Sequence, residues 1–437
     1  MNISQAIRFN SSTSVALVGS GGKTTMLFKL ARELQPPVIV TASSHLHIDQ
    51  IKLADSHWKG NKPEELSGLE DNLCGVMLVT GPVEGDRAQG LNDDAISWLH
   101  TICSAHALPL LIEADGSHQH PLKAPADHEP PIPDFISMVV VIAGLSGIGK
   151  PLTGKIVHRP EIFGCLSGLA SGDIITVEAL ASVLTNPAGG LKNIPIQARR
   201  VVLLNQADTA DLQAQGQEVA EKLLPTYQSI VIASLQHSII HSVHEPTAGI
   251  ILAAGEAKRF GRPKQLLNYK GQPFVRNIAV AALNSGLSPV VIVTGAYSEQ
   301  VEEVVNNMPV IIAHNKEWHD GQSSSIRVGL GTLPAETGSA IFLLADQPQV
   351  NPSILRALIE RHARDFSPII APLVQGQRAN PVLFDRVTFP DLISLNGDVG
   401  GRAIFPNYKV SYLPWHDESL LIDIDIPGDL AKLEDGD

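Results

Sequence analysis

The stretch GIILAAGEAKRFGRPK, residues 249–264, passes from a short apolar run into a glycine-rich loop. The apolar run has the length and composition of a buried strand. The loop carries the cations Lys258, Arg259, Arg262 and Lys264. So many like charges in a short loop repel one another unless an anion lies among them. A strand that ends in such a loop is typical of an open α/β sheet, which binds its ligand at the strand ends.

Short apolar runs alternate with helical stretches on both sides of this loop, which predicts an α/β fold with mostly parallel sheets. We predict two three-layer αβα Rossmann-like domains. The segment 236–249 contains His, Ser, Pro and Gly but little helical pattern, so we place the boundary near Glu245 and expect domains at 1–245 and 246–437. The expected strands are 14–19, 37–41, 75–80, 108–114, 137–143, 200–205 and 229–233, then 249–254, 289–295, 309–314, 340–346 and 367–373.

Composition narrows the class of protein. The 437 residues are 44% hydrophobic and 18% charged, a globular balance that suits two or three domains. The formal charge of −13 repels polyanions, so we expect no nucleic-acid partner. No apolar run is long enough to span a membrane, and residues 1–12 lack the apolar core of a signal peptide, so we expect a cytoplasmic protein. Cys74, Cys103 and Cys165 form no CxxC pair and are expected to be ordinary buried thiols.

The loop that follows 249–254 has the residue types of a triphosphate site. Gly255 allows backbone N–H groups to approach a phosphate, and Arg259 and Lys264 supply positive charge. Asp346 follows another apolar strand, at a place where an acid commonly holds Mg²⁺. A solvated basic loop and a turn or N-cap aspartate are the alternatives.

Several motifs of the second half together resemble the MobA-like nucleotidyltransferases. The pattern LAAG-x-x-x-R-x-G-x-x-K is made by Leu252, Ala253, Ala254, Gly255, Arg259, Gly261 and Lys264. The segments 315–330, 343–348, 376–384, 396–402 and 423–430 match the molybdenum cofactor cytidylyltransferase branch in order and spacing. The resemblance covers residues 248–433 and implies a fold like that of nucleotide-diphospho-sugar transferases. LAAG and DQP resemble the cytidylyl-transferring members, whereas guanylyl-transferring members more often have LAGG, so CTP is the expected nucleotide.

The expected reaction transfers CMP from CTP to the terminal phosphate of molybdopterin and releases pyrophosphate. Alignment and charge neutralisation suffice for this reaction, so no side-chain nucleophile is required. Asp346 and Asp425 are the candidate Mg²⁺ ligands, with Asp423 as the substitute for Asp425.

Two further groups of residues complete the expected site. Ser323, Ser324, Ser325 and Arg327 stand at an expected helix start. They offer donors to the base or to an anion, or alternatively form a plain N-cap. The resemblance alone assigns Asn380, Asp398 and Arg402 to the pterin side of the site.

The first half has its own glycine-rich loop, VALVGSGGKTT at 15–25, between an expected strand and an expected helix. It resembles a P-loop, although the full pattern requires glycine where Leu17 stands. Gly21, Gly22 and Lys23 are expected at the phosphates, and Thr24 at Mg²⁺. The first domain is therefore predicted to be P-loop-like, with a glycine-rich turn that binds no ligand as the alternative.

Acidic and amide side chains follow later strands of the first half. Glu113 and Asp115 end an apolar run, where a Walker-B acid that binds magnesium is expected. Asn205 and Asp208 resemble the guanine-reading NxxD of GTPases. A carboxylate there can accept two hydrogen bonds from guanine, so GTP is favoured over ATP. An ordinary turn at a strand end explains the same residues.

The segments 21–24, 113–117, 121–125, 158–161 and 205–208 together resemble the selenium-dependent hydroxylase accessory proteins of the YqeC type, over about residues 5–235. A weaker metal candidate is the loop group His118, His120 and His128, since loop histidines without cysteines are usually solvated.

The whole chain is then interpreted as a bifunctional maturation protein for a client molybdenum hydroxylase. Its second domain would be the cytidylyltransferase and its first a GTP-binding accessory domain. The alternatives are nucleotidyl transfer to another phosphorylated alcohol, and a GTP-gated cofactor chaperone without turnover.

Overall fold

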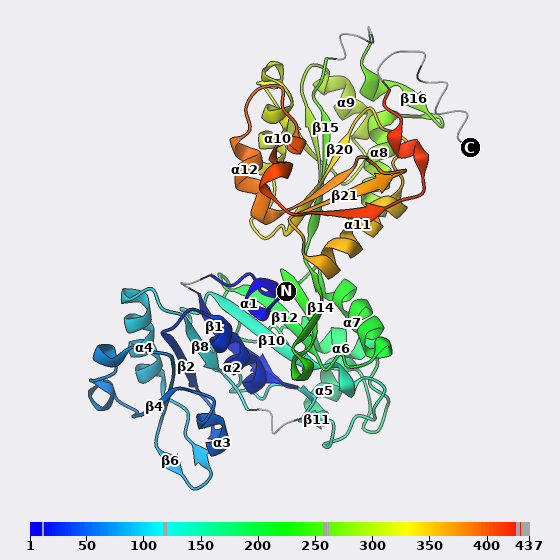
Figure 1. Cartoon of the computed structure of the whole chain (residues 1–437). Coiled ribbons are helices and arrows are strands. Elements are labelled where there is room, and N and C mark those ends of the chain that lie inside the picture. The colour runs from blue at the N-terminus through cyan, green and yellow to red at the C-terminus, as the bar shows by residue number, and fades with distance from the viewer. Residues whose placement is uncertain (11–12, 117–119, 257–259, 261, 425–428, 430–437) are drawn as a thin grey trace. The chain divides into compact units, whose positions relative to one another are not determined.

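The computed structural model describes residues 1–10, 13–116, 120–256, 260, 262–424 and 429. The chain divides into two compact units, Met1–His244 and Glu245–Asp437, and each unit has its own sheet (Figure 1). Within the described ranges, no helix is both long and apolar enough to cross a membrane.

The sheet of unit 1 is parallel except at one edge. Its strand order is β14-β13-β12-β10-β1-β8-β2-β5-β4, and the edge strand β14 runs antiparallel to β13. The central strands bury nearly every residue, as strands covered on both faces must. The strands are β1 (Ser14–Gly19), β2 (Val38–Ala42), β4 (Ser56–Lys59), β5 (Val76–Thr80), β8 (Leu110–Glu113), β10 (Met138–Gly144), β12 (Arg199–Asn205), β13 (Ser229–Ser234) and β14 (Ile239–His244).

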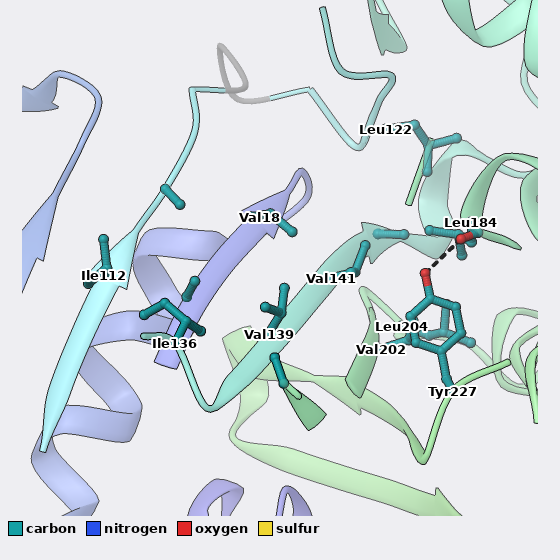
Figure 2. Close-up of a cluster of buried hydrophobic side chains, with 14 of the residues drawn as sticks. Val18, Ile112, Leu122, Ile136, Val139, Val141, Leu184, Val202, Leu204 and Tyr227 are labelled. Atoms are coloured by element: carbon teal, nitrogen blue, oxygen red, sulfur yellow. Dashed lines mark hydrogen bonds between the residues drawn. The ribbon is translucent and has the colours of Figure 1, made fainter. Parts of the chain in front are cut away.

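Helices pack on both faces of this sheet, because alternate residues of a strand point to opposite sides. Val139 and Val141 of β10 belong to a buried cluster that includes Leu184 of α6, and the intervening Val140 is buried outside it (Figure 2). Tyr227 lies in the same cluster, where its hydroxyl donates to Leu184 O at 2.6 Å. Helix α2 packs against β1, β2 and β8. The helices are α1 (Ile3–Ala6), α2 (Lys23–Glu33), α3 (Ile48–Ile51), α4 (Asp93–Ala105), α5 (Pro160–Ser167), α6 (Val177–Thr185) and α7 (Ala210–Leu223).

Small ribbons flank this sheet. β9 pairs in parallel with β11, and β7 pairs antiparallel with both β3 and β6. Their bounds are β3 (Leu46–His47), β6 (Val83–Glu84), β7 (Arg87–Ala88), β9 (Leu122–Lys123) and β11 (Val157–His158).

The sheet of unit 2 is mixed. Its order is β19-β18-β15-β20-β23-β21-β22, and β24 pairs in parallel with β21. β15 lies between two parallel neighbours, β18 and β20. The strands are β15 (Thr247–Ala253), β18 (Val290–Thr294), β19 (Ile311–His314), β20 (Ser339–Leu344), β21 (Ile369–Val374), β22 (Gln377–Arg378), β23 (Val382–Asp385) and β24 (Val410–Pro414), with the small hairpin β16 (Asn268–Tyr269) and β17 (Gln272–Pro273).

Unit 2 has three layers. On β15, Ile250 packs with the cluster of α10 and α12, whereas the next residue, Ile251, packs with that of α8, α9 and α11. Its neighbour β20 does the same, with Phe342 on the first face and Ile341 on the second. The predicted α/β fold is therefore confirmed. The helices are α8 (Phe274–Asn284), α9 (Ser298–Val305), α10 (Gln322–Gly331), α11 (Pro352–Asp365) and α12 (Phe389–Ser394).

Every strand expected from the sequence has a counterpart, but some strands were not expected. β14 lies within the segment 236–249, where sequence analysis placed the domain boundary and expected no strand. As an edge strand it is only partly buried, so its apolar pattern is weak. The expectation for the cysteines was wrong in part. Cys103 is buried, which raises its pKa to about 12, whereas Cys74 and Cys165 are exposed.

Candidate functional site

A cleft of about 530 Å³ opens where β15 and β20 end in unit 2. This position agrees with the rule that open α/β sheets bind ligands beyond the carboxyl ends of their strands. An added side-chain carbon at Gly255 would meet no atom within 4 Å, so open space lies in front of this loop residue. The predicted site residues that line the cleft are Leu252, Ala253, Ala254, Gly255, Lys264, Ser325, Asp346 and Asp398.

Lys264 and Asp346 face each other in this cleft. The Lys264 Nζ lies 3.6 Å from the Asp346 Oδ2, and the two side chains are 14% and 37% exposed. They come together because β15 and β20 are adjacent parallel strands, so their carboxyl ends meet at one edge of the sheet. Because solvent reaches both side chains, each can give up the other as its partner and bind a ligand instead.

Gln265, which sequence analysis did not predict as a site residue, supports the loop through hydrogen bonds. Its side chain is buried, and its Nε2 donates to Ala253 O at 3.3 Å and to Gly255 O at 3.2 Å. These bonds tie the strand end to the short 3₁₀ turn that presents Lys264. The available signal was a polar residue next to the apolar pair at 266–267.

Helix α10 begins at the opposite side of the cleft. Gly321 precedes it with φ of 92°, and a side-chain carbon there would lie 2.4 Å from Asp398 Cα. Glycine therefore allows the 397–398 segment to approach the helix start. The Gln322 N–H donates to Asp398 Oδ1 at 3.3 Å, and a carboxylate at a helix N-terminus is favoured by the helix dipole.

The three serines of α10 separate in the structure. Ser325 lines the cleft, whereas the other two hydroxyls donate to backbone carbonyls. Ser323 donates to Gly397 O at 2.7 Å, and Ser324 donates to Gly321 O at 2.8 Å. Both are buried and hold the helix start in place, but neither forms a plain N-cap, because Gly321 occupies the N-cap position and the helix has no side-chain capping bond.

The remaining predicted residues of this half lie off the cleft lining. Arg327 donates to Leu395 O at 2.5 Å, which fixes the segment before Asp398. Asn380 is half-buried and Arg402 is exposed, and neither lines the cleft.

Two aromatic side chains of the cleft were also not predicted. Trp318 and His319 line it, with their ring centroids 3.5 Å apart and their planes inclined by 27°. Flat rings at a cleft wall can stack against a heteroaromatic ligand. Both residues belong to the motif at 315–330, in which sequence analysis weighed only the serines and the arginine.

Some predicted residues lie outside the described residues: Arg259, Gly261, Asp425 and His118. Asp423 is described, does not line the cleft, and accepts a hydrogen bond from Gln347 at 2.7 Å. No group of three or more His, Cys, Asp or Glu arranged to hold a metal occurs in the described part of the chain. The Mg²⁺ site with Asp346 and the one with Thr24 and Asp115 therefore stay predictions.

The loop of unit 1 is built on left-handed glycines. Gly19, Gly21 and Gly22 have φ of 93°, 84° and 135°, which favours glycine at each position. A side-chain carbon on Gly21 would lie 2.7 Å from Pro121 O, so the loop is packed closely against the segment that begins at Pro121.

The lysine of this loop is buried. Lys23 Nζ donates to Gly19 O at 2.7 Å, and it lies 3.2 Å from Asp115 Oδ1 and 3.9 Å from Glu113 Oε1. The Thr24 hydroxyl donates to Glu113 Oε2 at 2.8 Å. Burial raises the pKa of Glu113, against the influence of Lys23 and Thr24. The structure thus brings together the four side chains that the sequence had suggested for phosphate and magnesium.

The two NxxD residues have structural contacts. Asn205 is buried, and its Nδ2 donates to Gly21 O at 2.7 Å while its Oδ1 accepts the Leu235 N–H at 2.9 Å. Asp208 is exposed and accepts a hydrogen bond from the Ser234 hydroxyl. Asn205 therefore anchors the glycine loop to the turn after β13.

His120 and His128, the described members of the candidate metal group, have different surroundings. His120 Nε2 bonds to Gly154 O at 2.8 Å, and its ring stacks with His158. His128 is exposed. Neither belongs to a metal-binding group among the described residues.

Each unit thus presents a glycine-rich loop at the end of a central parallel strand, the architecture of nucleotide-handling α/β domains. Comparison with known families narrows this class. Residues 15–161 match the family model described as YqeC protein, and residues 249–411 match the model described as MobA-like NTP transferase domain. The chain thus carries a YqeC domain followed by a MobA-like NTP transferase domain.

Individual relatives match one unit each. Uncharacterized protein YqeC of Escherichia coli (strain K12) is 29% identical over 223 residues, 48% of this chain and 82% of its own length. Nicotine blue oxidoreductase of Paenarthrobacter nicotinovorans is 32% identical over 196 residues, 42% of this chain and 95% of its own length. A probable molybdenum cofactor guanylyltransferase of Bacillus cereus (strain ATCC 10987 / NRS 248) is 32% identical over 139 residues, 31% of this chain and 66% of its own length.

Proposed function

We propose that unit 2 transfers CMP from CTP to molybdopterin and releases pyrophosphate. The observation that carries this proposal is the cleft in which Lys264 and Asp346 face each other 3.6 Å apart, beside open space at Gly255. A lysine can neutralise a triphosphate, and a carboxylate can hold its magnesium. Membership of the MobA-like NTP transferase family supports transfer chemistry at this cleft.

The residues of the cleft have distinct tasks in this reaction. An oxygen of the molybdopterin phosphate attacks the α-phosphorus of CTP, a new P–O bond forms, and the bond to pyrophosphate breaks. Lys264 stabilises the negative charge that collects on the leaving pyrophosphate. Asp346 would hold Mg²⁺, which supplies Lewis-acid charge neutralisation when bound. Asp398 lines the cleft, and its carboxylate would accept N–H groups of a heterocycle. The Gln322 N–H at the helix start donates to its Oδ1 and holds the carboxylate in place.

A second candidate is transfer of GMP from GTP. The relative in Bacillus cereus named as a probable guanylyltransferase favours it, because it matches 139 residues of this chain. LAAG at 252–255 favours the cytidylyl branch by resemblance. Another relative bears the name of an oxidoreductase, but the cation and acid of the cleft suit phosphate chemistry better than hydride transfer.

For unit 1 we propose a GTP-binding accessory role in maturation of a client molybdenum hydroxylase. Support comes from the glycine loop, with Lys23 and Thr24 beside Glu113 and Asp115. The contacts of Asn205 to the loop leave base recognition to Asp208, which is exposed at the strand end.

Pyrophosphate release tests the transferase directly. Purified full-length protein is incubated with molybdopterin, Mg²⁺ and each nucleoside triphosphate in turn. CTP is expected to give the highest kcat/KM. Higher activity with GTP would support the second candidate, and release with a phosphorylated sugar but not with molybdopterin would change the acceptor.

A further inference from the structure

In the described part of unit 1, three cations and three carboxylates form one connected and largely buried charge cluster beside the glycine loop. Its members are Lys23, Lys123, Arg159, Glu113, Asp115 and Glu129. The side chains of Lys23 and Lys123 are each only 1% exposed. The loop accounts for Lys23, but no phosphate-binding pattern accounts for Lys123.

Lys123 enters the charge cluster from β9, far along the chain from the loop. Its Nζ lies 2.7 Å from Asp115 Oδ2 and 2.8 Å from Glu129 Oε2. The Gly19 N–H donates to the same Asp115 Oδ2 at 3.2 Å. The ammonium of Lys123 and the first glycine of the loop therefore share one oxygen atom.

A purely structural role does not explain this lysine well. Burying an ammonium group costs free energy, and an apolar side chain of similar volume often stabilises a fold as well or better. Asp115 also lies 3.2 Å from Lys23, so one carboxylate serves two lysines. Its Oδ1 forms this ion pair with Lys23 but accepts no hydrogen bond within the described structure.

The two lysines of the charge cluster compete for one carboxylate. Asp115 pairs with both Lys23 and Lys123, whereas Glu129 pairs with Arg159 at 2.6 Å as well as with Lys123. Burial opposes ionisation of Glu129, but hydrogen bonds from Arg159 and Lys123 outweigh it and lower the pKa of Glu129 to about 2. An anion at the loop would give the two lysines a negative partner besides Asp115, while Glu129 keeps Arg159.

The loop supplies backbone donors for such an anion. Among the described residues, the N–H groups of Gly21, Gly22, Lys23 and Thr24 have no acceptor. Successive N–H groups at the start of a helix form a concave site that suits phosphate. The lysines and these donors converge on the same short loop.

We propose that Lys123 is a second phosphate-binding cation of unit 1, which together with Lys23 binds a diphosphate group at the glycine loop. When the diphosphate binds, the two ammonium groups transfer from Asp115 to adjacent phosphoryl groups, and Arg159 keeps Glu129 paired. This inference rests on the proposed phosphate-binding role of the loop, and it adds a residue that the loop itself does not contain.

Inorganic pyrophosphate tests the inference without a nucleoside. The full chain carrying Lys264→Ala, which weakens the triphosphate site of unit 2, is the parent for calorimetric titration. Lys123→Gln is expected to weaken pyrophosphate binding at least about tenfold, the usual worth of a charge-assisted contact. Glu129→Gln is expected to strengthen it severalfold, because Lys123 then has one carboxylate fewer to leave. Lys192→Ala is the matched control, because Lys192 donates to the backbone carbonyls of Ala126 and Asp127. The pyrophosphate affinity of this variant should equal that of the parent.

The outcomes separate this inference from the proposed function. If the parent binds pyrophosphate, Lys23→Ala abolishes binding and Lys123→Gln does not weaken it, the inference is wrong and the role of the loop stands. If the parent does not bind, both are wrong. If Lys123→Gln fails to fold, Glu129→Gln decides, because a merely structural Lys123 predicts lower stability of that variant with no gain in affinity.

Discussion

The loops that follow β1 and β15 use the same residue types in different surroundings. Lys23 is 1% exposed and lies among two acids, of which Asp115 is 2% exposed. Lys264 is 14% exposed, and its acid, Asp346, is 37% exposed at the edge of an open cleft. Two similar strand-loop motifs therefore produce one closed ionic cluster and one accessible site.

The difference teaches that a lysine and an aspartate at a strand end do not by themselves determine function. Loss of one partner of a buried ion pair strongly destabilises the fold, because the other charge is left without compensation. Exposed pairs contribute little to stability but can be reached by a ligand. Substitutions should therefore affect stability first in unit 1 and activity first in unit 2.

The largest expected effect is on the stability of unit 1. Asp115→Ala should lower its free energy of unfolding by about 3–5 kcal/mol, because two buried lysines lose a shared carboxylate. Asp346→Ala should change the stability of unit 2 by less than about 1 kcal/mol. Hydrogen–deuterium exchange of peptides from each unit measures both. Equal losses in the two variants would remove the contrast between the loops.

The next effect is on catalysis in unit 2. Asp346→Ala should lower pyrophosphate release with CTP and molybdopterin at least about 100-fold, since it removes the proposed magnesium ligand. Asp423→Ala is the control, because that acid bonds to Gln347 outside the cleft lining. Full activity of Asp346→Ala would contradict its assignment as the magnesium ligand. An equal loss of activity in Asp423→Ala would point to Asp423 as a magnesium ligand.

A smaller effect is expected from the two lysines. Lys264→Ala should reduce kcat/KM for nucleotidyl transfer by about 10- to 50-fold, because one charge-assisted contact to the triphosphate is lost. Lys23→Ala should leave that constant within about twofold. If both variants lost transfer activity equally, the two loops would serve one reaction.

The acid sensitivity of unit 1 provides a finer test. The pKa of Glu129 is lowered from 4.5 to about 2 in the folded protein, so its ionised form stabilises the fold above pH 4.5. That contribution is lost as the pH falls from 4.5 toward 2. In Glu129→Gln this part of the acid-induced loss should disappear from unfolding curves measured across that window. Glu64→Gln, which alters an exposed acid, should keep the wild-type slope.

The smallest expected effect concerns the buried support of the cleft. Gln265→Ala should raise the KM for CTP about threefold, since the backbone around Gly255 loses two hydrogen bonds. Gln272→Ala, at an exposed position of β17, should not alter it. Michaelis–Menten analysis of both variants gives the comparison. A kcat loss with unchanged KM would point to a different role for Gln265.

The sequence predicted the layered fold, because apolar runs of strand length define the strands. It assigned Lys264 and Asp346 to one site, and the structure places them 3.6 Å apart where neighbouring parallel strands end. It missed Gln265 and Trp318, whose contacts depend on how the chain folds back after the loop. The directions of the Ser323 and Ser324 hydroxyls were equally hidden, since they depend on the rotation of α10 against the 397–398 segment. Side-chain pairing across distant segments requires the three-dimensional structure.

The passage from β14 to β15 has a practical consequence for dissecting the chain. Only Glu245 and Pro246 separate the two strands, and both belong to the packing of unit 2, where Gly338 N donates to Pro246 O at 2.9 Å. A truncation at residue 235, just before the segment 236–249, would strip β14 from the sheet and leave β13 as a bare hydrogen-bonding edge prone to aggregation. A cut after His244 preserves every strand of both sheets, so the two units can be separated there.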